Sequence, residues 1–180
     1  PHTAVLVGGQ AVFEPVDDDD IRLIRWEADG WRQIGAFDVF HDFIDAGAIG
    51  VSGDGRVALV PNGAAFSEEG GQLSVLAIDG DRLSEVQRLT GLRDARQARF
   101  APDGVTALLT RFEPGRVTVL HAIEGEVRQI EELVVPLADH VAFVWGGPDE
   151  GRAVLPSVHP VNGSQVIVLR VTEPGRVVLE

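Results

Sequence analysis

The residues of this chain that could do chemistry are its histidines and the charged residues that accompany them. His41-Asp42 and Asp139-His140 are adjacent pairs, and His159 lies in the segment 157–163. A carboxylate beside an imidazole orients the ring, which favours a general base or a metal ligand. An arginine can polarise a carbonyl or bind an anion. The candidates for catalysis are His140, His159 and Arg96, and those for ligand binding are His41, Asp42, Arg96, Arg111, Asp139, His140 and His159.

A run of four acidic residues is a weak candidate for a metal site. It comprises Asp17, Asp18, Asp19 and Asp20. Ca²⁺ prefers several carboxylate oxygens, so calcium is the cofactor that this run suggests, although nothing in the sequence requires a cofactor. Consecutive aspartates lack the alternate spacing of a known calcium loop, and a solvated acidic turn is the simpler interpretation of the run.

Composition excludes several classes of function. Asp and Glu number 28 against 15 basic residues, which gives a net charge of −13 and argues against binding nucleic acid. Cysteine is absent, so thiol catalysis and thiolate metal sites are excluded. No run approaches the roughly 20 apolar residues of a membrane span. The motifs of serine hydrolases, phosphate-binding loops and zinc proteases are also missing.

An internal repeat is the element that must position these residues. Residues 51–59, 100–108 and 147–155 align, and each contains an acidic residue followed closely by glycine and an apolar run. Their last leucines, Leu59, Leu108 and Leu155, stand 49 and 47 residues apart. A second element, at 73–80, 117–125 and 166–172, follows each of them. A period of this length with four strands per repeat is typical of a propeller blade.

The segments within each repeat are short, rich in β-branched residues and separated by turn residues, which predicts strands. We expect one all-β domain of about four blades, each made of four antiparallel strands, with repeats at about 1–37, 38–89, 90–134 and 135–180. The first repeat has three strands and lacks the inner one. The predicted strands are Thr3–Val7, Ile21–Glu27, Trp31–Phe37, Ala48–Ser52, Arg56–Val60, Gln72–Ile78, Arg82–Leu89, Gln97–Phe100, Val105–Arg111, Arg116–Ile123, Glu126–Val134, His140–Trp145, Gly151–Pro156, Ser164–Val171 and Gly175–Leu179.

The strand count leaves two arrangements open. An isolated blade cannot bury its faces and needs a neighbour on each side. The chain therefore closes as a tight four-bladed ring with a borrowed strand, or it forms an open half-propeller. We expect the half-propeller, completed by a second copy or by further chain.

The repeats resemble those of lactonase-like seven-bladed propellers and their relatives with a surface-protein repeat. Phe100-Ala101-Pro102-Asp103-Gly104 and the segment from Leu73 to Gly80 carry most of the resemblance, which covers residues 48–135 well. The resemblance implies a blade fold. It maps no catalytic residue onto this sequence, because such repeats serve hydrolases, electron-transfer partners and binding proteins alike.

The blade topology predicts where the polar residues meet. Connections from the second to the third strand of a blade share one face with connections between blades, and function is usually carried by such loops. The candidates above are expected to converge at that face around the central channel. The alternative is that they are ordinary solvated loop charges, paired from blade to blade.

Three functions are compatible with this arrangement. The first is a non-catalytic binding module that takes a small polar ligand or a protein partner on its loop face. The second is a lactonase-type hydrolase, with a His/Asp/Arg cluster at the central channel. The third is a structural half-ring that completes a larger assembly. We favour the binding module over an enzyme, and we expect an extracytoplasmic location (periplasmic or secreted), although no signal peptide is present in the sequence.

Overall fold

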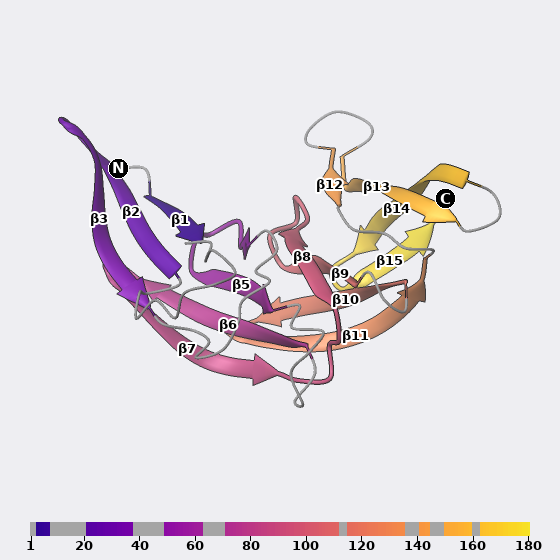
Figure 1. Cartoon of the computed structure of the whole chain (residues 1–180), viewed down its shortest axis with the longest axis horizontal. Helices are drawn as coiled ribbons and strands as arrows, with labels where there is room; N and C mark the ends of the chain where they lie inside the picture. Colours follow the sequence, from indigo (N-terminus) through magenta and orange to yellow (C-terminus); the bar gives the residue numbers. More distant parts are fainter. Residues whose placement is uncertain are drawn as a thin grey trace, which may run out of the picture.

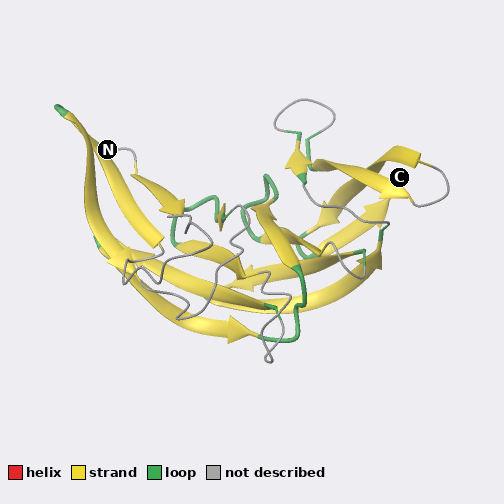
Figure 2. Cartoon of the chain, in the orientation of Figure 1, coloured by secondary structure: helices red, strands yellow, loops and turns green. Residues whose placement is uncertain are grey.

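The computed structural model of this chain describes residues 3–7, 21–37, 49–62, 71–111, 115–135, 141–144, 150–159 and 163–180. All regular structure in these ranges is β-strand (Figure 2), so the all-β prediction is confirmed. The same ranges contain no helix that is long and apolar enough to cross a membrane.

The strands form four antiparallel sheets, which we call blades 1 to 4. Blade 1 contains β1 (Thr3–Val7), β2 (Ile21–Glu27) and β3 (Gly30–Phe37). Blade 2 contains β4 (Gly50–Val51), β5 (Val57–Asn62), β6 (Gln72–Asp79) and β7 (Arg82–Leu89). Blade 3 contains β8 (Ala95–Phe100), β9 (Thr106–Arg111), β10 (Arg116–Ile123) and β11 (Glu126–Val134). Blade 4 contains β12 (Ala142–Phe143), β13 (Arg152–His159), β14 (Gly163–Glu173) and β15 (Arg176–Leu179).

The blades follow one another along an open arc (Figure 1). Blades 1 and 4 stand at its two ends, the inner strands β8 and β12 lie on its concave side, and the outer strands β3, β7 and β11 lie on its convex side. Each blade pairs its strands in chain order from the inside outward. This arrangement is a partial β-propeller, as the repeat predicted.

Buried side chains between consecutive blades form the core. One cluster joins blades 2 and 3 through Leu59, Leu73, Ala98 and Leu109, and another joins blades 3 and 4 through Leu108 and further residues. Every side chain of β9 is buried, because neighbouring blades cover both of its faces. The outer strand β7 instead alternates between exposed and half-buried side chains, because one of its faces meets water.

The predicted Asp-Gly turns form as expected. Gly55 and Gly104 have φ of 72° and 75°, a backbone conformation that glycine adopts without strain. The preceding aspartates hold the turns, because Asp54 accepts a hydrogen bond from the Arg56 N–H at 3.0 Å and Asp103 accepts one from the Thr106 N–H at 2.8 Å.

The two tryptophans of blade 1 pack on each other. Trp26 and Trp31 are cross-strand neighbours in the β2–β3 hairpin, with ring centroids 5.2 Å apart and ring planes at 70°. Trp26 and Trp31 are 48% and 55% exposed, so the neighbouring blade does not bury them.

Candidate functional site

The structure brings two sets of connections to one face, as the blade topology predicted. The connection from β5 to β6 meets the connection from β7 to β8, where the Leu92 N–H donates to the Gly71 carbonyl at 2.8 Å. In the next blade, the Val135 N–H donates to the Gly115 carbonyl at 3.0 Å. Gly71 is required for the first contact, because a Cβ there would lie 2.1 Å from the Leu92 oxygen. We call this side the loop face.

Arg96 is held at the loop face by an unusual piece of backbone. The pairing of β8 with β9 shifts between Ala95 and Gln97, so Arg96 is the extra residue of a β-bulge on the innermost strand of blade 3. Its guanidinium lies 2.8 Å from the carboxylate of Asp94, and the two side chains are 31% and 6% exposed. Asp94 has a φ of 59°, which a residue other than glycine rarely adopts. Bulges re-aim a side chain, and strained residues concentrate at functional sites.

Arg111 occupies the same face, but it is buried inside the protein. Its Nε donates to the Arg93 carbonyl at 3.1 Å, and its Nη2 donates to the Gly91 carbonyl at 3.3 Å. Its Nη1 donates to a Glu132 oxygen at 2.6 Å. The other oxygen of that carboxylate accepts from Arg116 at 2.8 Å. Arg111 therefore ties the connection between blades 2 and 3 to the outer strand β11.

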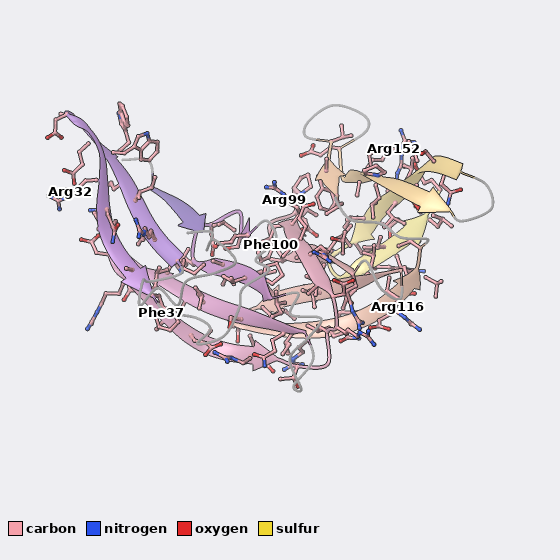
Figure 3. All side chains as sticks on the ribbon, viewed as in Figure 1. Arg32, Phe37, Arg99, Phe100, Arg116 and Arg152 are labelled. Atoms are coloured by element: carbon pink, nitrogen blue, oxygen red, sulfur yellow. The ribbon has the colours of Figure 1, made fainter. Side chains whose placement is uncertain are left out.

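A second arginine of the innermost strand, Arg99, lies where sequence reasoning did not place a candidate. Figure 3 shows Arg99 and Phe100 at the concave side of the arc. Both line a hollow of about 260 Å³, together with Val51 of β4 and Phe143 of β12. The hollow thus lies among the innermost strands of three consecutive blades. The sequence signal for Arg99 was an arginine on the predicted inner strand Gln97–Phe100, three positions after Arg96.

Several predicted site residues lie outside the described ranges: His41, Asp42, Asp139, His140, and Asp17, Asp18, Asp19 and Asp20. His159 is the last residue of β13, and its side chain is not described. Within the described ranges, no three His, Asp or Glu side chains gather closely enough to hold a metal ion. Of the predicted ligand-binding residues, Arg96 and Arg111 are the two whose side chains the structure describes.

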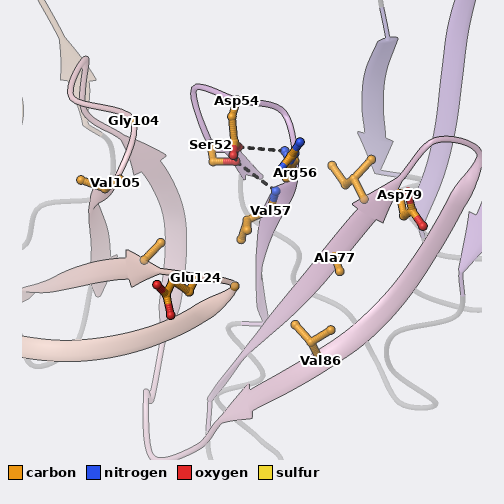
Figure 4. Close-up of a pocket in the computed structure, with 13 residues that line it drawn as sticks. Ser52, Asp54, Arg56, Val57, Ala77, Asp79, Val86, Gly104, Val105 and Glu124 are labelled. Carbon is orange, nitrogen blue, oxygen red and sulfur yellow. Dashed lines mark hydrogen bonds between the residues drawn. The ribbon is translucent and has the colours of Figure 1, made fainter.

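A larger hollow, of about 590 Å³, lies on the opposite face between blades 2 and 3 (Figure 4). Its walls carry Asp54, Arg56, Asp79 and Glu124, together with apolar side chains that include Val57 and Val86. The hydrogen bond from Ser52 lowers the pKa of Asp54 below its ordinary value, assisted by the Arg56 N–H and opposed by slight burial. Sequence reasoning missed this hollow, because it arises from contacts between repeats.

Comparisons with known proteins bear on the fold. No family model matches the sequence, and no curated protein matches it. Among solved structures, a protein from Bacteroides uniformis described as a proposed 6-phosphogluconolactonase superposes with a TM-score of 0.63 at 16% identity, over 88% of this chain and 50% of that one. A functionally unknown protein from Desulfotomaculum acetoxidans gives a TM-score of 0.70 at 12% identity, over 89% of this chain and 48% of that one.

The periplasmic gluconolactonase of Pseudomonas aeruginosa is also similar. It gives a TM-score of 0.62 at 14% identity, over 98% of this chain and 66% of that one. The chain spans about half the length of the first two proteins. At these identities the likeness concerns the fold, which agrees with the resemblance carried by the repeats. The chain therefore shares its fold, four-stranded antiparallel blades set along part of a propeller, with the lactonase-like propellers.

Proposed function

We propose that the loop face of this chain binds a small anionic ligand, with Arg96 as the contact residue. The observation that carries the proposal is the Arg96–Asp94 ion pair at the bulge of β8. The buried carboxylate of Asp94 fixes the direction of a guanidinium that remains 31% exposed. A guanidinium held in place before binding loses little freedom when a carboxylate or phosphate docks on its planar donors.

The surrounding charge supports a site of this kind. The chain as a whole carries a net charge of −13, which repels anions from most of its surface. Arg93 and Arg99 lie in the same inter-blade connection and strand as Arg96, within seven positions of sequence. An anion would therefore be attracted to this part of blade 3.

A periplasmic gluconolactonase among the similar structures supports an extracytoplasmic location for the chain.

The test uses gluconate and 6-phosphogluconate as probes in isothermal titration. Saturable binding of either anion is expected, with Arg96→Gln weakening it at least tenfold. Arg82→Gln is the matched control, because Arg82 is an exposed arginine of the outer strand β7. Absence of saturable binding, or equal affinity in the Arg96→Gln protein, would overturn the proposal.

Hydrolysis of a sugar lactone is the second candidate, favoured by the gluconolactonase and the proposed 6-phosphogluconolactonase among the similar structures. A lactonase needs a donor that stabilises the developing oxyanion and a base that activates water. Arg96 would supply the donor, and His140 or His159 would act as the base. Proton release from glucono-δ-lactone above the spontaneous rate, lost in Arg96→Gln, would support this function. A rate equal to the spontaneous one would contradict this second candidate.

A further inference from the structure

One position on the third strand of the blades faces the next blade along the arc. In blades 2 and 3 the third and fourth strands share an irregularity, a register shift after Val75 and Val119 respectively. Blade 1 has three strands, and its last two, β2 and β3, show the same shift after Leu23. Counting two residues onward from the shift gives equivalent positions. They are occupied by Arg25, Ala77 and His121.

The arginine and the histidine each fill the space beneath the hairpin turn of the following blade. Arg25 forms an ion pair with Asp81, which lies in the turn between β6 and β7. His121 packs on Gly175, in the turn between β14 and β15, so closely that a Cβ on that glycine would lie 3.1 Å from the ring. A long side chain at this position therefore joins one blade to the next.

Blade 2 has alanine at this position, and no side chain of the described residues fills the space beneath the next turn. Ala77 lines the 590 Å³ hollow, together with Glu124 and Gly125 of the turn between β10 and β11. A second difference between the two junctions lies in the residue that pairs with this position on the neighbouring strand. At the junction of blades 3 and 4, the Thr106 hydroxyl accepts a hydrogen bond from the Gly175 N–H at 2.7 Å. Val57, which pairs with Ala77 as Thr106 pairs with His121, has no hydroxyl to do the same.

The turn residue that aligns with Asp81 is Gly125, and the acid at this junction is Glu124, one residue earlier in the turn. Glu124 lines the hollow from the next blade's turn, and Asp79 lines it from blade 2. Neither carboxylate forms an ion pair or a side-chain hydrogen bond with another described residue. Val57, Val86 and Val105 supply an apolar wall. Asp54 and Arg56 also line the hollow, so its charged lining comprises three acids and one base. A positively charged head on an apolar stem matches this combination.

We propose that this hollow binds the side chain of an arginine presented by another polypeptide. The bound guanidinium would take the place that Arg25 occupies beside Asp81 at the first junction, here beside Glu124. Its methylene stem would cover the space above Ala77. The site lies on the face opposite Arg96, so it does not depend on the function proposed above.

The probes are N-acetyl-arginine amide and its citrulline counterpart, which has nearly the same shape but no charge. Saturable shifts of the backbone amide signals of Ala77, Glu124 and Gly125 are expected with the arginine compound. Citrulline is expected to bind at least tenfold more weakly. Absence of saturable shifts with arginine, or equal affinity for the two compounds, would overturn the proposal.

Variants separate this site from a general attraction to an acidic surface. Ala77→Arg should fill the hollow from within and abolish binding, whereas Glu124→Gln should weaken binding several-fold. Glu131→Gln is the matched control, because Glu131 is an exposed acid of the same blade, and it should leave the affinity unchanged. Arg25→Ala should create a second site beside Asp81. If Ala77→Arg does not fold, unchanged affinity in Glu124→Gln refutes the proposal and weakened affinity supports it.

Discussion

The side-chain amide of Gln87 pairs with both backbone groups of Val127, across the boundary between blades 2 and 3. Its Nε2 donates to the Val127 carbonyl at 2.9 Å, and its Oε1 accepts from the Val127 N–H at 2.9 Å. Gln87 lies on β7 and Val127 on β11, the outer strands of their blades. One side chain thus continues the hydrogen bonding of a sheet from one blade to the next.

Replacing Gln87 by leucine should destabilise the chain by about 2 kcal/mol, because a partly buried N–H and C=O would both lose their partner. Urea unfolding at neutral pH measures the change. The matched control is Gln129→Leu, since Gln129 is an exposed glutamine of β11. Equal stabilities of the two variants would contradict the role assigned to Gln87.

The Arg111–Glu132 ion pair should be a major contributor to the stability of blade 3. The Arg111 side chain is 8% exposed, and Glu132 also binds Arg116. Glu132→Ala would leave the buried guanidinium without its counter-ion, at a cost of about 2 kcal/mol after allowance for the partial exposure of Glu132. Glu126→Ala removes an ion pair with Arg128 that is exposed to solvent, so its unfolding midpoint should match that of the native chain. A similar loss in both variants would refute this prediction.

Two turn glycines with similar backbone conformations should differ in their tolerance of alanine. Gly125 and Gly175 have φ of 85° and 74°, so alanine is strained at both, by about 1–2 kcal/mol. A Cβ on Gly125 would meet open space, whereas one on Gly175 would press on the His121 ring at 3.1 Å. Gly175→Ala should therefore be the more destabilising variant in urea unfolding. The extra loss of unfolding free energy in Gly175→Ala, relative to Gly125→Ala, should shrink when His121 is also replaced by alanine. If it does not shrink, the contact with the His121 ring is not its cause.

The stability of the chain should depend on Asp54 in acid. The Ser52 hydrogen bond lowers the pKa of Asp54 in the folded state below the ordinary 3.8. A carboxyl group with a lowered folded pKa stabilises the protein above its unfolded pKa, and this contribution is lost as the pH falls through the folded pKa. Asp54→Asn should thus be less stable than the native chain at pH 7. The difference in free energy of unfolding between the two should narrow below about pH 4.

Ser52→Ala offers an internal check on that explanation. This substitution removes the 2.7 Å hydrogen bond from the Ser52 hydroxyl to Asp54. The difference in free energy of unfolding between this variant and the native chain should therefore also narrow in acid. Some cost should remain at every pH, since the Ser52 hydroxyl also accepts from the Val57 N–H at 3.0 Å. Urea unfolding between pH 7 and pH 3 measures both variants. A gap that stays constant for Asp54→Asn would show that Asp54 does not titrate with a lowered pKa.

Within the part of the chain that the structure describes, the order and approximate bounds of the strands could be predicted from local patterns. Predictions for Arg82–Leu89, Arg116–Ile123 and Glu126–Val134 agree with the structure to the residue. Alternating burial and Asp-Gly turns are properties of adjacent residues, which is why sequence alone revealed them. The inner strand of blade 3 begins at Ala95 instead of the predicted Gln97, because the bulge at Arg96 interrupts the alternation.

The relation between blades was decided by the tertiary structure. The sequence contains Arg96 and Arg111 as similar loop arginines, yet one is presented by a bulge and the other is buried among carbonyl groups. It also contains Arg25, Ala77 and His121. Aligning the repeated segments 73–80 and 117–125 from their first residues puts Ala77 and His121 at the same position, but this does not show that the position faces the next blade. Their contact with the following blade depends on strand register and on the turn of that blade, and it joins residues about 50 positions apart. Side chains that meet across such a separation leave no local pattern, so only the folded chain shows which junction is filled and which is empty.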